Sequence, residues 1–144
     1  MIQFQGVEDF NVVPEVLFAK LADAGFLVRS LPDSEVIEAG PDRGVWKLRP
    51  KLSFLSGAIE TTLSVVERTA PTQAKYVIVG KGVGATSTVG ATLNFEAMET
   101  GSRVNWTAEV TALTGLLKLV PKGLIQATAG TVIADVWAAL HKAV

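Results

Sequence analysis

The spacing of apolar residues along the chain first predicts a strand followed by a helical hairpin. Residues 2–12 place Phe and other apolar residues among polar ones, as in a half-buried edge strand. Pro14 suits a first helical turn, where its missing N–H would be unpaired, and Gly25 is expected to break this first helix. A second short turn over residues 26–31 ends before Pro32, because proline stops a helix.

From residue 33 to residue 115 the apolar residues instead recur at every second position, which is the period of a strand. Turns that contain Gly or Pro separate the segments. Successive hairpins of this kind predict an antiparallel meander with one dry and one wet face. The candidate strands cover residues 34–39, 45–52, 59–65, 74–80, 89–95 and 104–110.

Residues 121–144 return to helical spacing and predict one long C-terminal helix of roughly 30 Å. Its apolar stripe has to lie on the dry face of the sheet. The pattern therefore predicts a single α+β domain over residues 1–144, in which a curved antiparallel sheet of about seven strands wraps this helix. The stripe consists of Ile125, Ala129, Val132, Ile133, Val136, Trp137 and Leu140.

The amino-acid composition of the chain argues against several classes of function. The 144 residues are 49% hydrophobic and 19% charged, with a net charge of −1 and no basic block, which argues against nucleic-acid binding. Cysteine is absent, so disulfides and thiolate chemistry are excluded. The sequence shows neither a signal peptide nor an uninterrupted apolar run of about 20 residues. We therefore expect a cytoplasmic protein without a transmembrane segment.

Two features invite a catalytic or cofactor interpretation. The glycine string over residues 80–84 would suit a phosphate loop only if a helix followed, but residues 85–89 have the pattern of a strand, so a hairpin turn or bulge is predicted. His141 is the only histidine and is expected to be exposed at the helix end. It lacks partners for a catalytic triad or a zinc site. No catalytic residue, metal ligand or cofactor is predicted.

The dry face of the sheet and the helix stripe together suggest an internal binding site. A pocket for an apolar molecule is concave and mostly apolar, with a few polar groups. The alternative is that the same side chains pack as an ordinary core. The predicted ligand-binding residues are Trp46, Leu48, Ile59, Leu63, Leu93, Phe95 and Trp106 on the sheet, Ile125, Ala129 and Val132 on the helix, and the polar Thr61, Tyr76 and Thr128.

A set of short motifs in this order of elements resembles a known superfamily. They are Phe4-Gln5-Gly6, Leu31-Pro32-Asp33, Phe54-Leu55-Ser56-Gly57, Gly80-Lys81-Gly82-Val83-Gly84, Thr100-Gly101-Ser102-Arg103-Val104-Asn105-Trp106 and Leu113-Thr114-Gly115-Leu116-Leu117. The arrangement resembles the helix-grip fold of the START and Bet v 1-like (SRPBCC) superfamily, and within it the G-subunit family of carbon monoxide dehydrogenase.

The resemblance implies non-catalytic binding or transport of a hydrophobic small molecule, lipid-like or quinone-like, in an internal cavity. It also implies a molybdenum hydroxylase as a protein partner and peripheral contact with a membrane. Some members of the superfamily are enzymes, so a cyclase or hydrolase that uses the same cavity is the alternative function. A buried carboxylate pair in the cavity would favour that alternative.

Overall fold

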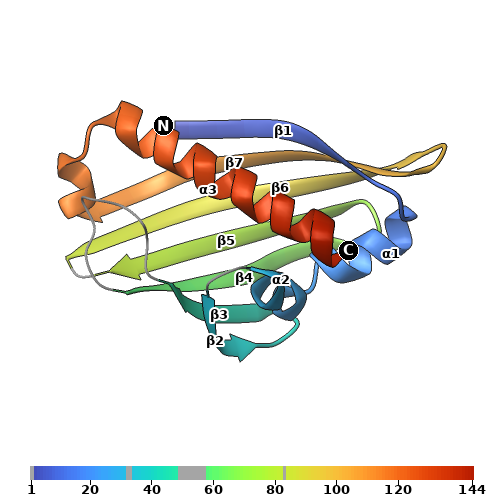
Figure 1. The fold of residues 1–144 in the computed structure, drawn as a ribbon, viewed down its shortest axis with the longest axis horizontal. Helices are drawn as coiled ribbons and strands as arrows, with labels where there is room; N and C mark the ends of the chain where they lie inside the picture. Colours follow the sequence, from blue (N-terminus) through green and yellow to red (C-terminus); the bar gives the residue numbers. More distant parts are fainter. Residues whose placement is uncertain (1, 32–33, 49–57, 83) are drawn as a thin grey trace.

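The computed structural model describes residues 2–31, 34–48, 58–82 and 84–144, with the backbone alone at Leu48. One antiparallel sheet of seven strands has the order β1-β7-β6-β5-β4-β3-β2, and a long helix crosses one of its faces (Figure 1). The strands are β1 (Ile2–Phe10), β2 (Ser34–Ala39), β3 (Arg43–Leu48), β4 (Ile59–Thr69), β5 (Gln73–Gly82), β6 (Ala85–Met98) and β7 (Gly101–Gly115). The helices are α1 (Pro14–Leu21), α2 (Ala24–Ser30), the 3-10 helix η1 (Leu116–Leu119) and α3 (Lys122–Ala143).

The chain path explains the strand order. From edge strand β1, helices α1 and α2 carry the chain to the opposite edge, where β2 begins. The meander then returns strand by strand until β7 pairs with β1, with Ile2 opposite Val110. The predicted α+β arrangement, its strand number and its antiparallel meander are confirmed.

The helical hairpin breaks at a different residue from the one predicted. Gly25 was expected to end the first helix, but it lies in the first turn of α2. The break occurs at Asp23, whose carboxylate accepts hydrogen bonds from the backbone N–H of Gly25 (2.9 Å) and of Phe26 (3.4 Å). This is an N-cap, which favours the start of a helix. Glycine suits its position because a Cβ there would lie 2.9 Å from the Ala39 carbonyl oxygen.

Strands β6 and β7 are longer than predicted. The segment predicted over 89–95 belongs to a strand that runs from Ala85 to Met98, and β7 continues to Gly115. The strand predicted over 45–52 is confirmed up to Leu48, and residues 49–52 lie outside the described residues, as does the motif at 54–57. Sequence reasoning missed η1 because four residues are too few to show a period.

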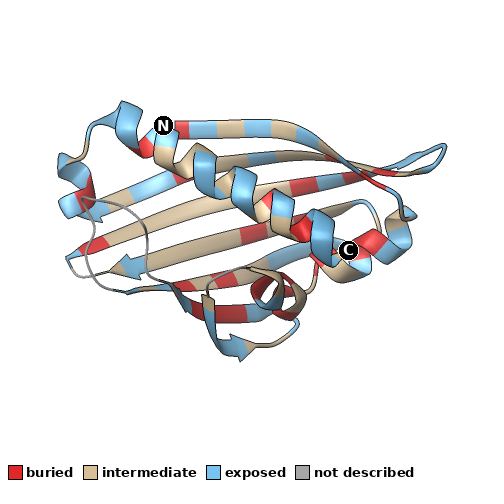
Figure 2. Ribbon diagram, in the orientation of Figure 1, coloured by how far each residue is buried: buried red, intermediate tan, exposed pale blue. Residues whose placement is uncertain are grey.

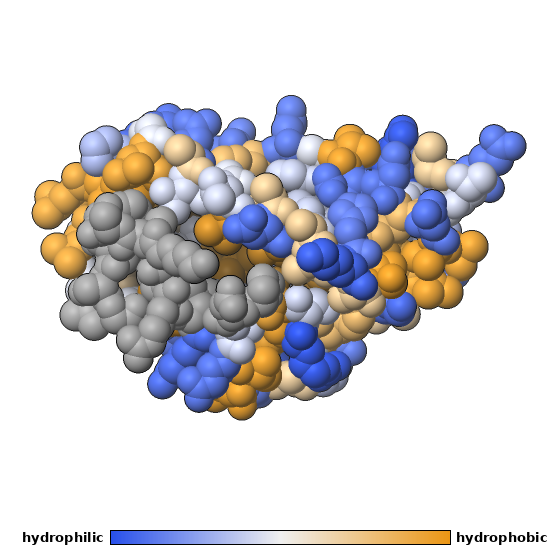
Figure 3. All heavy atoms as spheres, in the orientation of Figure 1, coloured by the Kyte–Doolittle hydropathy of each residue, from blue (hydrophilic) through white to orange (hydrophobic). Residues whose placement is uncertain are grey.

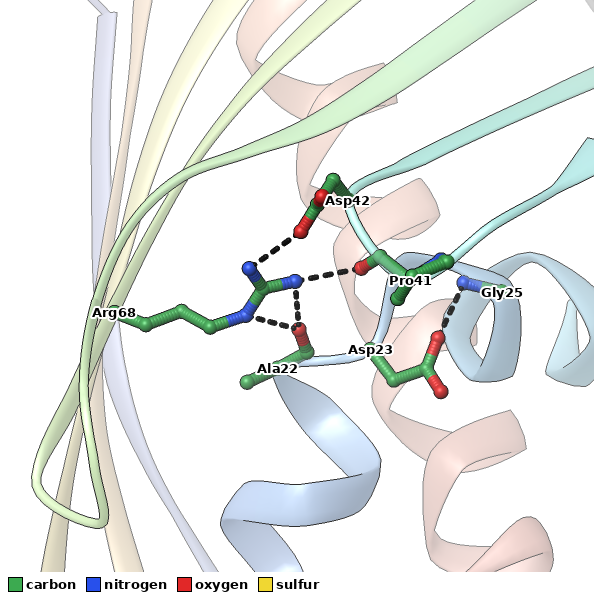
Figure 4. A network of polar contacts seen from close by, with 6 residues as sticks. All are labelled: Ala22, Asp23, Gly25, Pro41, Asp42 and Arg68. Carbon is green, nitrogen blue, oxygen red and sulfur yellow. Dashed lines mark hydrogen bonds and ion pairs between the residues drawn. The ribbon is translucent and has the colours of Figure 1, made fainter.

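Arg68 on β4 holds two turns together (Figure 4). Its Nε and Nη2 donate to the carbonyl oxygen of Ala22 (3.1 and 3.0 Å), and Nη2 also donates to that of Pro41 (2.6 Å). Its Nη1 pairs with Asp42 Oδ1 at 2.6 Å. The guanidinium thus holds the α1–α2 turn and the β2–β3 turn against the sheet.

Buried apolar side chains form two clusters at different ends of the molecule. The main core joins α1 and α2 to the inner face of the sheet and to the C-terminal half of α3 through Trp137 and Leu140. A small cluster at the other end consists of Ile2, Ala85, Val110, Leu117 and Ile125. In Figure 2 most of the visible surface of α3 between the two clusters is exposed. The helix is therefore anchored mainly at its ends.

Helix α3 confirms the predicted position and length, but its stripe is buried less fully than predicted. Its buried side chains are Ile125, Trp137 and Leu140. Val132 was predicted to face the interior, whereas it is 54% exposed. At 100° per residue Val132 lies on the flank of the stripe, whose centre runs between Ala129 and Leu140. By length and composition α3 could cross a membrane, and core helices meet the same criterion.

His141 was predicted to be exposed at the end of the helix, but its side chain contacts β1. Its Nε2 lies 2.8 Å from Glu8 Oε1, and its ring stacks on Phe10 with 4.2 Å between the ring centroids. Its side chain is 40% exposed. The last turn of α3 is therefore attached to β1 through a polar and an aromatic contact.

Candidate ligand pocket

The floor of the candidate site is a pair of glycines on β5. Gly80 and Gly82 alternate with Lys81, so both glycines occupy positions on the inner face of the sheet. Gly80 is in register with Thr61 on β4 and with Ser87 on β6. Because neither glycine has a side chain, the inner face is hollow where an ordinary strand residue would fill the space.

Side chains from the neighbouring elements close the space above the glycines. The pocket has a volume of about 160 Å³ and is partly open to the surface. Helix α3 forms its roof through Ile125, Thr128 and Ala129, and Leu117 of η1 lies at one end. The remaining lining residues are Ile59, Gly80, Gly82, Ala85, Ser87, Val89, Val110 and Leu113.

The chemistry of this lining is apolar, with two hydroxyl groups. Among the described residues that line the pocket, Ser87 and Thr128 carry the polar side-chain atoms, and none of them has an ionisable side chain. In the described part of the chain, no three His, Asp or Glu side chains come together as a metal site. Such a pocket can hold an apolar group and offer it a hydrogen bond.

The structure separates the predicted ligand-binding residues into groups. Ile59, Ile125, Thr128 and Ala129 line the pocket, and Thr61 lies beside its floor. The side chain of Leu48 lies outside the described residues, and Val132 is on the exposed flank of α3. The others belong to the main core or pack against it, away from the pocket lining: Trp46, Leu63, Tyr76, Leu93, Phe95 and Trp106.

Tyr76 has a structural hydrogen bond that the sequence could not indicate. Its hydroxyl donates to the Leu21 carbonyl oxygen of α1 at 2.7 Å, and burial raises the pKa of the phenol well above its usual range. This donor is therefore already engaged. The indole N–H groups of Trp46 and Trp106 are buried without a hydrogen-bond partner among the described residues.

Sequence reasoning missed the glycine floor and the wall formed by β6, β7 and η1. The glycine string predicts a hairpin turn or bulge after a strand that ends at Gly80, whereas β5 continues to Gly82. The turn itself is confirmed at Gly84, which has a φ of +71°. The alternation of two glycines with Lys81 was the signal that could have placed both on the inner face.

A surface of exposed leucines adjoins the pocket. We call Leu116, Leu119 and Leu124 the leucine end, and they are 51%, 81% and 44% exposed. They flank the pocket-lining Leu117 and Ile125 in sequence. In Figure 3 hydrophobic atoms gather at this end of the molecule, where Figure 1 places η1 and the start of α3. Between Glu109 and Asp135 the sequence has two lysines and no carboxylate.

Comparison with solved structures supports the arrangement of sheet and helix. A conserved protein from Geobacillus kaustophilus has a similar structure with a TM-score of 0.82 at 15% identity, covering 97% of this chain and 93% of that chain. A START superfamily protein from Mycobacterium smegmatis gives a TM-score of 0.66 at 10% identity, covering 97% and 94%. The fold is therefore the START-like helix-grip fold, as the motifs predicted.

A sequence comparison with curated proteins gives no match. The family model of the carbon monoxide dehydrogenase G subunit (CoxG), in contrast, matches residues 6–144, which is nearly the whole chain. The resemblance that the short motifs indicated is thus confirmed, and the chain belongs to the CoxG family of carbon monoxide dehydrogenase.

Proposed function

We propose that the protein binds a hydrophobic small molecule in the pocket above Gly80 and Gly82 without transforming it. The observation that carries this proposal is the hollow itself, with its apolar lining and its partial opening to the surface. The ligand-binding residues that we propose are those that line or adjoin this hollow, including Ile59, Thr61 and Ile125. We propose the cytoplasm as the compartment in which it acts.

The size of the pocket limits what it can enclose. An apolar cavity of about 150 Å³ holds a benzene-sized molecule, so this pocket of about 160 Å³ suits one ring. Burial of six CH₂-sized groups at about 0.8 kcal/mol each contributes about 5 kcal/mol. Before the cost of association is subtracted, this corresponds to a Kd of about 0.2 mM, which is therefore the tightest binding that such burial alone could give. A lipid-like or quinone-like ligand would place its ring here and extend its chain through the opening to the surface.

The alternative, an enzyme of the cyclase or hydrolase type, has less support. Acid–base catalysis needs a titratable group within hydrogen-bond reach of the reacting atoms. The described lining supplies hydroxyl groups but no carboxylate, histidine or lysine. The hydroxyl groups can orient a ligand. Without a titratable group beside them, the lining favours binding of a ligand over its chemical conversion.

The direct test fills the pocket from its floor. Gly80→Val is expected to abolish saturable binding of α-methylstyrene, followed by NMR titration, because the new side chain occupies the hollow beside Ile59. A Cβ at this position lies 3.1 Å from Ser87 Oγ, so the Ser87 side chain has to shift. The better fit of valine to a strand offsets this cost, and stability should change by less than about 1 kcal/mol. Gly90→Val is the matched control, because no atom lies within 4 Å of a Cβ placed there. Equal binding by both variants would contradict the proposal.

The family connects the proposed ligand with a protein partner. Because the chain belongs to the CoxG family, we propose that it assists a molybdenum hydroxylase of the carbon monoxide dehydrogenase type by carrying the ligand. Sedimentation of the purified protein with such an enzyme, in the presence and absence of α-methylstyrene, measures the association. Two independently sedimenting species under both conditions would argue against this partner.

The leucine end favours peripheral contact with a membrane. Leu119 is 81% exposed, and Lys118 and Lys122 are the only charged residues between Glu109 and Asp135. Exposed apolar side chains with flanking lysines are typical of surfaces that insert into anionic membranes. We propose that this end contacts the bilayer, which would bring the pocket close to a lipid-soluble ligand.

Leu119→Glu is expected to weaken binding to vesicles that contain phosphatidylglycerol by at least about tenfold, because full burial of one leucine contributes about 1.5–3 kcal/mol. Cosedimentation with the vesicles measures this change. Val16→Glu on α1, at the other end of the molecule and 44% exposed, is the control and should bind like the wild type (Figure 1). A wild-type protein that stays in the supernatant would refute the membrane contact.

A further inference from the structure

Strand β1 forms an open edge of the sheet. It stands first in the strand order, and its partner in the described part of the chain is β7 alone. Their pairing runs from Ile2 to Phe10 without a register shift. In Figure 1 β1 is the outermost strand along the upper border of the sheet. The N–H and C=O groups on its outer side are therefore available to another strand.

The opposite edge of the sheet is protected against such pairing. Strand β2 has six residues, and a bulge between Val36 and Glu38 interrupts its pairing with β3. It also carries exposed charges at Glu35 and Glu38. Short length, bulges and charges are features that prevent edge-to-edge association. Strand β1 has nine residues, an uninterrupted register and neither lysine nor proline, so the two edges differ.

The alternation of the backbone decides which residues of β1 offer free groups. Gly101 on β7 packs directly against the Phe10 carbonyl oxygen, so the backbone groups of Phe10 point toward β7. In an antiparallel ladder this direction alternates from one residue to the next. The odd-numbered residues of β1 therefore point their N–H and C=O groups away from the sheet. They are Gln3, Gln5, Val7 and Asp9, and all four are exposed.

A second copy of β1 complements this edge. In an antiparallel pair with a two-fold axis at Gly6, Gln3 lies opposite the partner's Asp9, and Gln5 lies opposite the partner's Val7. Each such pair can exchange two hydrogen bonds, so this register uses the outward groups of all four residues. A register shifted by two residues leaves one of the four in each copy without a partner in β1.

The charges favour the same register. Strand β1 carries two acids and no basic residue, and like charges directly opposite each other are destabilising. With Gly6 on the axis, Asp9 lies opposite the partner's Gln3, and Glu8 lies opposite the partner's Phe4. The two copies of Asp9 are then six residues apart along the paired strands, which is about 20 Å.

Helix α3 leaves room for the second copy. A Cβ on Gly130 would lie 3.9 Å from Phe4 of β1, and His141 contacts the other end of that strand. At about 100° per residue, Ala127 and Ala134 lie on this same flank of the helix, and both are exposed. Because these side chains are small, two copies of α3 can lie close together above the paired strands.

We propose that the protein forms a two-fold symmetric homodimer through β1. The strand pairs antiparallel with β1 of a second copy, and Gly6 lies nearest the axis. The two seven-stranded sheets thereby become one continuous sheet. No residue of β1 is among the described residues that line the pocket, so this inference is independent of the proposed ligand.

Gln5→Pro tests the edge. The Gln5 N–H points away from β7, so proline removes a donor of the dimer and keeps the pairing of β1 with β7. Both copies lose this bond, and the Kd of the dimer is expected to rise at least about tenfold. Gln5→Thr keeps the N–H and should dimerise like the wild type. Sedimentation equilibrium gives the mass relative to the 15.2 kDa monomer, and thermal unfolding confirms that both variants are folded.

A pair of cysteines tests the register. The chain has no cysteine, so a disulfide can form only at introduced positions. The double variant Gln5→Cys/Val7→Cys is expected to give a covalent dimer on mild oxidation, because residues opposite each other lie about 5.5 Å apart, within disulfide reach. Gln5→Cys alone should lose most of this yield, since diagonal neighbours lie about 7–8 Å apart. Non-reducing gel electrophoresis measures both yields.

The outcomes decide between the dimer and a single chain. A wild type that sediments as the monomer at every concentration up to its solubility limit overturns the proposal. A dimer that is equally stable in folded Gln5→Pro overturns it too, because the interface would then lie elsewhere. If Gln5→Pro does not fold, the cysteine variants decide. Equal yields from the double and the single variant contradict the register, whereas a covalent dimer that needs both cysteines supports it.

Discussion

Trp106→Ala is expected to lower the free energy of unfolding by about 3–5 kcal/mol, because it removes a large side chain from a packed region. Trp106 packs against the main core, with its ring centroid 5.9 Å from that of Trp137. It also covers Gly6, where a Cβ would lie 2.7 Å from the ring atom Cζ2. Since Trp106 is not among the pocket-lining residues, the affinity for α-methylstyrene should be unchanged in protein that remains folded.

Urea unfolding measures the loss of stability, and NMR titration of the folded variant measures the affinity. Trp106→Phe is the matched control, because it keeps an aromatic ring and removes the indole N–H that has no described partner. It should cost less than the alanine variant. A small loss of stability together with a large loss of affinity would instead place Trp106 in the ligand site.

Replacement of Arg68 by alanine is expected to cost about 2–3 kcal/mol of stability, since hydrogen bonds from a charged group to carbonyl oxygens are lost together. The guanidinium links the carbonyls of Ala22 and Pro41 (Figure 4). Without it, the α1–α2 turn and the β2–β3 turn lose their shared attachment to β4. Chemical denaturation followed by tryptophan fluorescence measures the change.

Two further variants identify which contacts matter. Asp42 is 75% exposed, so Asp42→Asn should cost less than about 1 kcal/mol, as is usual for exposed ion pairs. Arg68→Lys keeps the charge but loses the fork that reaches two carbonyls, and it should resemble the alanine variant. If Asp42→Asn proved as costly as Arg68→Ala, the ion pair and not the carbonyl contacts would hold the turns.

Much of the fold could be predicted from the period of apolar residues, since the side chains that face inward are set by the helix or strand geometry. The long helix and the meander were predicted on this basis. The break between the first two helices was misplaced because it depends on a polar contact. Asp23 begins α2 through its carboxylate, and a periodic pattern carries no information about such a cap.

The candidate site was harder to predict. The spacing of apolar residues shows which side chains face inward, but it does not show which of them lie around the same pocket. Trp46 and Phe95 face the same interior as Ile59, yet they lie in the main core and Ile59 lines the pocket. The hollow depends on where β5 ends. Beyond the end of β5 at Gly82, Gly115 packs closely against Gly84 in the turn, and the N–H of Leu116 donates to the Gly84 carbonyl oxygen at 2.9 Å.

The pairing of β1 with β7 has a consequence for synthesis on the ribosome. Ile2 is synthesised more than a hundred residues before its partner Val110. At about 5–20 residues per second this delay amounts to roughly 5–20 s. During that time β1 lacks its partner strand β7, so the sheet can be completed only after β7 has been synthesised. Nascent chains that end before β7 should therefore expose β1 to proteases and chaperones.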